Sequence, residues 1–303
     1  MVAIMEDLAL EVEKKERLPI KFGEMEFQHI ILTRFNLLLW DKAKDGQKVR
    51  TLKWLEHRFQ LFEKYCLPSI KNQTCHEFEW IILFDSVTPD NYKERIVCFQ
   101  KECPQMIPIF VEPENGRNFV EIFRSEIVRR AKAKRVITTY LDNDDALNVK
   151  FLEDLQQRVA LIDDDTFVYY DDGYQLYTDN KYVMRINHPR NHFVSYVEKG
   201  DLSTLKGVFC YGTHYFIYTI EGTKIEHVKN LRMWCEVVHE KNIYNDAYFL
   251  NAKMVRDEDL LRREFAIDET VKYGLSIYMF RFMPRYGRTF TRRAKKVIER
   301  LWP

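Results

Sequence analysis

Three carboxylates fall within four residues at Asp142-Asn143-Asp144-Asp145, directly after the apolar, β-branched run 136–141. In an extended chain, side chains at positions i and i+2 point to the same side, so Asp142 and Asp144 can share one ligand. Hard divalent cations take oxygen ligands and often bridge a protein carboxylate to substrate phosphates. The stretch therefore predicts a metal–diphosphate site, and the expected substrate is a nucleotide-activated molecule.

The same Asp-x-Asp spacing occurs twice more, at 163–165 and 257–259, and chance can produce such matches. Neither follows a strand-like run. The first closes a helical pattern and the second lies in a charged, helical stretch, so both are expected on a solvated surface. Ligands in open α/β sheets bind at the carboxyl ends of strands. Position in the chain therefore singles out Asp142 and Asp144.

Length and composition limit the class of protein. The 303 residues, 46% hydrophobic and 14% aromatic, suffice for one large domain with a sizeable core. A net charge of +1 gives no global field for nucleic acid. No long uncharged apolar run or signal-peptide pattern occurs, so no transmembrane helix is expected. The six cysteines include no CxxC pair, so we expect reduced thiols in a cytoplasmic protein and no zinc ribbon.

Strand-like and helix-like segments alternate through the first half of the chain. Buried strands are expected at 27–33, 78–84, 107–111, 135–141 and 166–170, and helices at 52–66, 92–103, 122–131 and 151–159. Pro68 is expected to interrupt the first helix, and Asn148 to cap the last. This alternation predicts βαβ units and a mostly parallel sheet.

The second half of the chain is more irregular. Segments 174–177 and 182–186 flank the turn residues 178–181, which predicts a hairpin. The aromatic-rich stretch 208–220 predicts a further strand.

The C-terminal stretch 274–303 is strongly basic. It carries eight Arg or Lys and one acidic residue, Glu299, so eight minus one gives +7, and aromatic side chains are interleaved with the charges. Such a segment can lie on an anionic membrane surface, or it can be a helix packed on the domain with a solvated basic face. Nucleic acid is a third possibility, which the near-neutral remainder of the chain disfavours.

Two stretches resemble family-2 glycosyltransferases with the GT-A fold. Residues 69–90 contain SIKNQT, a strand and the sequence DSVTPD, and residues 119–155 contain a helix, a strand, LDNDDALN and the helix FLEDL. The matching order covers about residues 27–160. The segments ILTRFN, LFEKYCLPSI and WIILFD are similar to the branch of putative rhamnosyltransferases.

The resemblance implies a Rossmann-like, nucleotide-sugar-binding α/β fold with a mostly parallel central sheet. It implies a metal-dependent inverting transferase of the hexosyltransferase type. Such an enzyme moves a sugar from a UDP or dTDP sugar to a hydroxyl of a glycan or glycolipid, and the name of the branch implies that the sugar is rhamnose. The implied location is the cytoplasm, or the inner face of the membrane as a peripheral protein. The expected layout is a leader at 1–26, a GT-A domain at 27–255 with a donor half at about 27–160 and an acceptor half at about 161–255, and a basic amphipathic helical extension at 256–303.

The resemblance also implies roles for residues around the nucleotide. Thr33 and Arg34, at the end of the first strand, would lie beside it. Asp85, ending the second strand, would accept a hydrogen bond from uracil or thymine. Arg124 would position its helix or the phosphates, or else form a surface salt bridge.

The aspartate motif would carry the cation and the sugar nucleotide. Asp142 would contact the ribose or the metal, and Asn143 would lie beside it. Asp144 would be the main ligand of Mn²⁺ or Mg²⁺, which bridges to the diphosphate. His239, in a Trp-x-x-x-x-His context, would be a further metal ligand.

Sugar transfer also needs a general base, because the acceptor hydroxyl must lose a proton. The family usually carries this base in a Glu-Asp pair, which does not occur here in the expected context. Glu236, near the sugar-packing residue type Trp234, is one candidate. Asp246 is another, with a helix N-cap as its alternative role, and Asp171 and Asp172 could also face the cleft.

Two other functions stay open on this sequence. The missing Glu-Asp pair would suit a catalytically silent GT-A-like domain that binds nucleotide or glycan. A nucleotidyltransferase would share the fold but release pyrophosphate instead of a nucleoside diphosphate.

Overall fold

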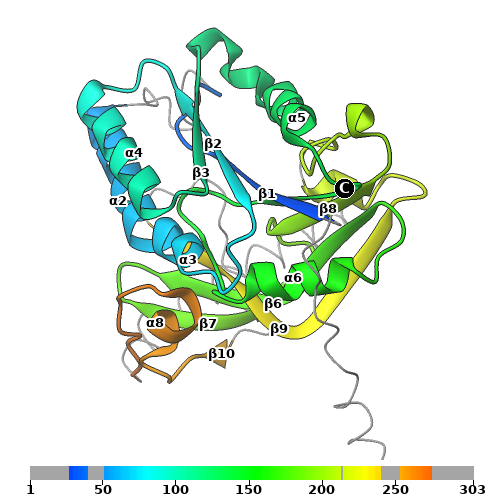
Figure 1. The fold of residues 1–303 in the computed structure, drawn as a ribbon. Helices are drawn as coiled ribbons and strands as arrows, with labels where there is room; N and C mark the ends of the chain where they lie inside the picture. Colours follow the sequence, from blue (N-terminus) through cyan, green and yellow to red (C-terminus); the bar gives the residue numbers. More distant parts are fainter. Residues whose placement is uncertain (1–26, 40–50, 213, 240–252, 275–303) are drawn as a thin grey trace, which may run out of the picture.

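The computed structural model describes residues 27–39, 51–212, 214–239 and 253–274. Their strands form one sheet in the order β10-β7-β6-β8-β4-β1-β2-β3, which β5 and β9 join at the side (Figure 1). The strands are β1 (Phe27–Arg34), β2 (Glu79–Asp85), β3 (Met106–Val111), β4 (Arg135–Tyr140), β5 (Ala146–Leu147), β6 (Thr166–Tyr177), β7 (Tyr182–Asn187), β8 (Val194–Lys199), β9 (Lys224–Val238) and β10 (Lys253–Met254). The helices are α2 (Leu52–Leu61), a π-helical turn (Phe62–Cys66), α3 (Leu67–Lys71), α4 (Asp90–Glu102), α5 (Phe119–Arg130), α6 (Phe151–Val159), α7 (His214–Ile217) and α8 (Leu260–Phe265).

The four strands of the first half are parallel and covered on both faces. β1 pairs with β2 and β4, and β2 pairs with β3, all in the parallel sense. Because neighbouring residues of a strand point to opposite faces, Ile31 joins the core under α2, α4 and α6, whereas Ile30 joins the core under α5. Figure 1 shows α2 and α4 on one side of these strands and α5 on the other. The predicted βαβ architecture is therefore confirmed.

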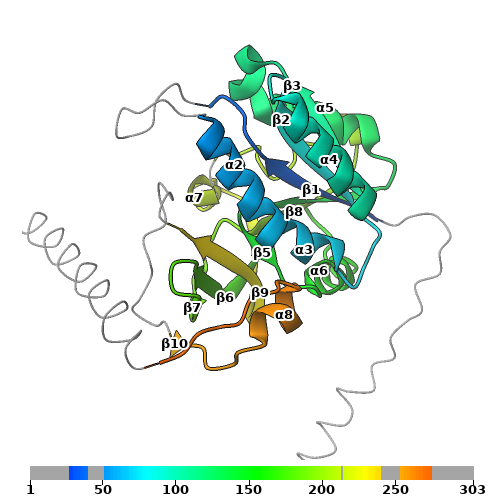
Figure 2. The ribbon, with the colours of Figure 1, turned by 90° about the vertical axis from the view of Figure 1, so that its left-hand side faces the viewer.

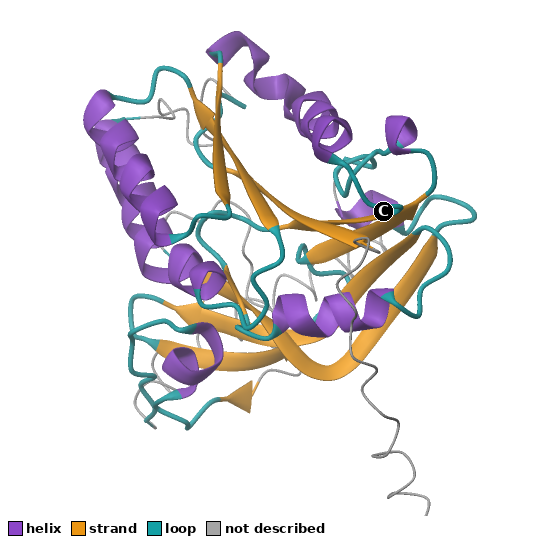
Figure 3. Cartoon of the chain, in the orientation of Figure 1, coloured by secondary structure: helices purple, strands orange, loops and turns teal. Residues whose placement is uncertain are grey.

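Beyond β4 the sheet is mixed. β8 runs antiparallel to both β4 and β6. β6 and β7 form the predicted antiparallel hairpin, in which Lys181 takes a left-handed φ of 56°. The long strand β9 runs parallel to β6 as far as Val238, and its residues Trp234 and Cys235 also pair with β5. Figure 3 shows the long, curved strands of this half of the sheet. Parallel pairing among the described strands thus occurs within β1–β4 and between β6 and β9, while the other pairs are antiparallel.

Strand β6 is longer than predicted. It continues through Asp171 and Asp172 to Tyr177, so these two aspartates lie inside the strand and do not end it. The pairing with β9 shifts register on either side of Asp172. Next to this irregularity the Trp234 ring lies against Gly173, where an added Cβ would overlap the ring. The absence of a side chain at Gly173 therefore permits β9 to pack closely on β6.

Two other local predictions are wrong. Pro68 does not end the helix: the chain passes from α2 through the π-helical turn into α3, and Pro68 lies in the first turn of α3, where proline is tolerated (Figure 2). The stretch 208–220 is not a strand, because Gly207 and Gly212 take positive φ values of 75° and 76° and the chain makes turns and the short helix α7.

The last described segment packs on the second half of the sheet. Leu260, Leu261 and Phe265 of α8 are buried with residues of β6, β7 and β9. The leader 1–26 and the basic stretch from residue 275 onward lie outside the described residues. None of the described helices is both long and apolar enough to cross a membrane.

Candidate active site

The aspartate motif lies where the two halves of the sheet meet. β4 delivers the chain to residues 142–145 at its carboxyl end, and β5 then pairs with β9 through Ala146 opposite Cys235 and Leu147 opposite Trp234. This pairing brings the end of β9 to the motif, where the Val237 amide donates to Asp145 Oδ1 at 2.8 Å. The strand therefore brings Glu236, and His239 directly after its end, to the carboxylates.

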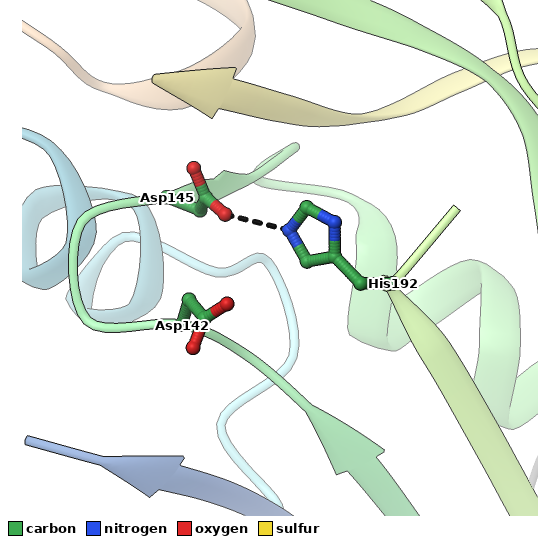
Figure 4. A group of neighbouring side chains, drawn as sticks. All are labelled: Asp142, Asp145 and His192. Carbon is green, nitrogen blue, oxygen red and sulfur yellow. Dashed lines mark hydrogen bonds and ion pairs between the residues drawn. The ribbon is translucent and has the colours of Figure 1, made fainter. Parts of the chain in front are cut away.

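Asp142, Asp145 and His192 form a compact group of possible metal ligands. One ligand atom from each residue lies within 4.8 Å of the others. Figure 4 shows Asp142 and Asp145 on the two limbs of the motif loop, with the His192 ring facing them from the segment before β8. His192 Nε2 lies 2.7 Å from Asp145 Oδ2. Asp142 is the most open of the three, with 35% of its side chain exposed.

Asp145 and His192 form a hydrogen-bonded pair in which the pKa of each group is raised. Burial raises the pKa of Asp145 to about 7. Burial alone would lower the pKa of His192, but its bond to Asp145 raises that pKa to about 9. A cation entering between these residues would displace the proton.

Asp144 has different partners. Arg58 of α2 donates from Nη1 to Asp144 Oδ2 at 2.7 Å and to Asn143 Oδ1 at 3.1 Å. His239 Nε2 lies 3.0 Å from the same Asp144 oxygen. Burial alone would raise the pKa of Asp144, but the Arg58 charge and the His239 hydrogen bond hold it well below its usual range. Asp144 is therefore an ionised carboxylate already neutralised by a protein cation.

Glu236 is a buried carboxylate beside this group. It is 8% exposed, and Gln175 Nε2, on the paired strand β6, donates to its Oε2 at 2.6 Å. Tyr177 in turn donates to Gln175 Oε1 at 3.0 Å. Burial, and then the charges of Asp144 and Asp142, raise the pKa of Glu236, while His192 and the Gln175 bond oppose the rise. Glu236 thus combines a fixed orientation with a raised proton affinity.

Trp234 is not a sugar-packing surface, contrary to the expectation from sequence. It is 1% exposed, its ring stacks on Phe193 at 4.9 Å, and its Nε1 donates to the Tyr170 carbonyl. It belongs to the core that supports β9.

Arg34 lies next to Asp142 within a set of aromatic rings. Its Nη2 donates to Tyr140 Oη at 2.7 Å, and Tyr140 Oη donates to Asp142 Oδ1 at 2.6 Å. Its guanidinium lies over the rings of Phe119, Tyr140 and Phe209, at 4.7, 5.5 and 5.5 Å. The neighbouring Thr33 is fully buried and accepts from Trp80 Nε1 at 2.9 Å. The Thr33 hydroxyl is therefore occupied by a hydrogen bond inside the core.

Asp85 lies at the carboxyl end of β2, fully buried. Its amide donates to Asn36 Oδ1 at 3.0 Å, and Asn36 Nδ2 donates to Thr88 Oγ1 at 2.9 Å. A cavity of about 230 Å³ adjoins this network and is lined by Asn36, Thr88 and the α2 residue Trp54, among others. The cavity and the aspartate motif are thus connected by one helix, α2.

The structure does not bring every predicted residue to the motif. Arg124 donates from Nε to the Leu205 carbonyl and pairs with Glu121 on its own helix. Asp171 pairs with His227 at 2.6 Å, and Asp172 accepts from Asn187. Asp246 lies outside the described residues.

Arg58 and His192 were not predicted from the sequence. They reach the motif from 86 and 47 residues away, and neither belongs to a local pattern. Asp145 was counted as the third carboxylate of the motif, but no metal-binding role was predicted for it.

The residues present fit a divalent cation. The three ligand atoms lie within 4.8 Å of one another, so small side-chain movements would bring all of them to about 2.1 Å from one ion. Carboxylate oxygens suit Mg²⁺ and Mn²⁺, and the imidazole favours Mn²⁺ over Mg²⁺. Asp142, Asp145 and His192 would hold such an ion. Asp144 and His239 could do so only if Arg58 gave up its bond to Asp144.

Comparison with solved structures finds a loose likeness of fold. S. aureus TarS has a TM-score of 0.37 and 12% identity over 71% of this chain, and TarS 1–349 in complex with UDP has 0.38 and 12% over 71%. The inositol-1-phosphate CTP transferase from T. maritima has 0.35 and 13% over 74% of this chain and 94% of its own. The present chain spans 37%, 60% and 61% of the three TarS chains compared.

Comparison with curated proteins found no match. The family model described as putative rhamnosyl transferase matches residues 28–238, which contain β1 to β9 and the whole aspartate motif. The match therefore covers more than half of the chain. The chain belongs to the putative rhamnosyl transferase family.

Proposed function

We propose that the protein transfers a sugar from a nucleoside-diphosphate donor to a hydroxyl of a glycan or glycolipid, with inversion and with the help of a divalent cation. The family description indicates rhamnose as the sugar. The observation that carries the proposal is the position of Glu236. This buried carboxylate lies within electrostatic range of Asp142, Asp144 and His192. A base and a diphosphate-binding group at one site are what single-displacement transfer requires.

In this proposal Glu236 takes the proton of the acceptor hydroxyl as that oxygen attacks the anomeric carbon. The bond from that carbon to the diphosphate breaks in the same step, so no covalent intermediate on the protein forms. Gln175 holds Glu236 in place through its 2.6 Å bond. Asp142, Asp145 and His192 would hold Mn²⁺ or Mg²⁺, which supplies charge stabilisation for the leaving diphosphate. Asp246 remains the second candidate for the base.

The cation has a competing set of ligands. Asp142, Asp144 and His239 were expected from the family resemblance. We favour Asp145 and His192 because Asp144 is already paired with Arg58 at 2.7 Å. Ranking the effects of Asp144 and Asp145 variants on Mn²⁺ affinity separates the two sets.

The nucleotide would lie between the motif and the end of β2. Asp85 would accept a hydrogen bond from uracil or thymine, and the cavity beside Asn36 and Thr88 offers about 230 Å³ near it. Arg34, next to Asp142, supplies positive charge, and Asn143 holds the loop by donating to the Phe35 carbonyl at 2.8 Å. Thr33 would contribute through its backbone, because its side chain is buried against Trp80.

The test is an assay of wild type and Glu236→Gln with UDP and dTDP sugars, Mn²⁺ and a glycan acceptor. Release of a nucleoside diphosphate by wild type, lost in the variant, supports the proposal. Release of pyrophosphate from a nucleoside triphosphate would indicate a nucleotidyltransferase instead. Nucleotide binding without any turnover would indicate a silent binding domain.

A peripheral membrane location is a further part of the proposal. It depends on the charge of +7 in residues 274–303, eight basic residues against one acidic, which would be attracted to anionic lipid on the cytoplasmic face. Wild type should sediment with anionic liposomes and a variant that lacks 274–303 should not. Equal sedimentation of the two would contradict it.

A further inference from the structure

Arg58 is a cation at the site to which no role has been given so far. It lies on α2, and its side chain is 21% exposed. Its Nη1 donates to Asp144 and Asn143, and its guanidinium lies over the Trp54 ring at 5.6 Å. Among the described residues, every side-chain hydrogen bond of Arg58 uses Nη1. The N–H donors on Nε and Nη2 therefore remain for solvent or a ligand.

The negative charge around the motif would repel a diphosphate unless a cation offset it. Asp142, Asp144, Asp145 and Glu236 are four acidic side chains, whereas a nucleoside diphosphate is itself an anion. One divalent ion held by two carboxylates leaves little net attraction for the diphosphate. Arg58 cancels Asp144 and touches two of the four motif residues, so a phosphate bound at the motif lies within its reach. Building on the proposed function, we propose that Arg58 binds the diphosphate of the donor directly.

The position of α2 places Arg58 where it can reach the diphosphate. Trp54 and Arg58 are four residues apart and therefore lie on one face of the helix, about 6 Å apart along its axis. Trp54 lines the cavity beside Asn36 and Thr88, while Arg58 reaches Asp144. One face of α2 thus extends from the nucleobase side of the site to the phosphate side. Stacking on Trp54 and the bond to Asp144 fix the guanidinium before a ligand arrives.

Arginine is suited to this task because its planar fork can form two parallel bonds to a phosphate while Nη1 stays on Asp144. Lysine would preserve the charge but not the fork. Asp144 and His239 then act as positioning residues for Arg58. This assignment also explains why the carboxylates of the motif have different partners. Asp142, Asp145 and His192 can bind a metal ion, whereas the Asp144 carboxylate is already paired with the Arg58 guanidinium.

The experiment compares the binding of UDP and UMP, by calorimetry at saturating Mn²⁺, to wild type, Arg58→Gln, Arg58→Lys and the control Arg95→Gln. Arg95 also pairs with carboxylates of the α2 region, Glu56 and Glu63, but has no contact with the motif. We expect Arg58→Gln to lower the affinity for UDP by about 10- to 100-fold. Arg58→Lys should lower the UDP affinity less. The affinity of the Arg58 variants for UMP, and that of Arg95→Gln for both nucleotides, should equal that of wild type. dTDP and dTMP serve as the second pair of probes.

A merely structural role predicts a different result. Equal weakening of UDP and UMP, or no weakening of either, overturns the proposal. So does a fall in Mn²⁺ affinity without nucleotide that parallels the loss of UDP, because Arg58 would then act through the metal site. If Arg58→Gln does not fold, the UDP-to-UMP comparison in Arg58→Lys decides alone. Failure of wild type to bind any nucleoside diphosphate overturns the proposed function and this inference together, whereas binding unaffected by Arg58 overturns only the inference.

Discussion

Gln175 and Glu236 lie opposite each other on β6 and β9, and Gln175 donates a 2.6 Å hydrogen bond to the carboxylate. Gln175 is itself fully buried and is held by Tyr177. The carboxylate therefore cannot rotate freely, and one of its oxygens is committed to a neutral donor. This leaves Oε1 as the atom that can accept a proton from a substrate.

Replacement of Glu236 by Gln should abolish transfer while leaving the donor bound. The amide keeps the shape of the side chain but cannot accept the hydroxyl proton, and general-base catalysis typically contributes about 10²- to 10⁴-fold. We expect kcat to fall by that order, with little change in the donor KM. Steady-state kinetics with varied donor measure both. Glu63→Gln, on the π-helical turn, is a control carboxylate, and full activity of Glu236→Gln would move the base to another residue such as Asp246.

Asp145→Asn should weaken Mn²⁺ binding more than Asp144→Asn does. Asp145 belongs to the group within 4.8 Å, whereas Asp144 is occupied by Arg58. Loss of a ligand should cost at least about tenfold in affinity, since even residues that only support ligands cost 10- to 100-fold. Titration with Mn²⁺, after removal of bound metal by a chelator, gives the order directly. The reverse order would establish Asp144 as the principal ligand.

The sequence predicted the parallel half of the fold well. Runs such as Trp80 to Phe84 are apolar without interruption because helices bury them on both faces, and that pattern is local. Asp142 and Asp85 could be placed at the ends of their strands for the same reason. The second half was harder to predict because the aromatic-rich composition of 208–220 suits either a strand or a buried turn. The chain turns there because Gly207 and Gly212 adopt positive φ values.

The partners of the motif could not be predicted because they depend on tertiary packing. Arg58 is 86 residues from Asp144, and His192 is 47 residues from Asp145. Both contacts require α2 and the segment before β8 to be docked on the sheet. The wrong prediction for Trp234 has the same cause. An indole near a candidate base suggests a surface for a sugar ring, and only its burial against Gly173 and Phe193 identifies it as a core residue.

Gly173→Ala should destabilise the fold and disturb Glu236 indirectly. The new methyl group would overlap the buried Trp234 ring, which is also fixed by its bond to Tyr170. Overpacking of this kind costs about 1–3 kcal/mol. Urea denaturation measures the loss. In a Trp234→Leu background the same change should cost less, since the overlapping ring is gone, and equal costs in both backgrounds would refute the explanation.

Buried His29 should make the fold acid-sensitive. Its Nε2 lies 2.8 Å from Thr139 Oγ1 and its Nδ1 lies 3.4 Å from Gln156 Nε2, which suits a neutral ring. Burial lowers the pKa of His29 from 6.5 to about 3. Between these values the unfolded chain binds a proton that the folded chain does not. The free energy of unfolding should therefore fall, as pH decreases through this window, by about 1.4 kcal/mol per pH unit from this residue.

Urea denaturation at several pH values between 6.5 and 4 tests this contribution. His29→Gln removes the titrating group, so its unfolding free energy should decline less steeply than that of wild type, whatever its stability at neutral pH. Burial also lowers the pKa of His188 to about 4, so part of the slope should persist in the variant. His76 is exposed, and His76→Gln should retain the wild-type slope. A slope unchanged by His29→Gln would mean that this ring is protonated in the folded protein, and that the Thr139 and Gln156 contacts accommodate the charge.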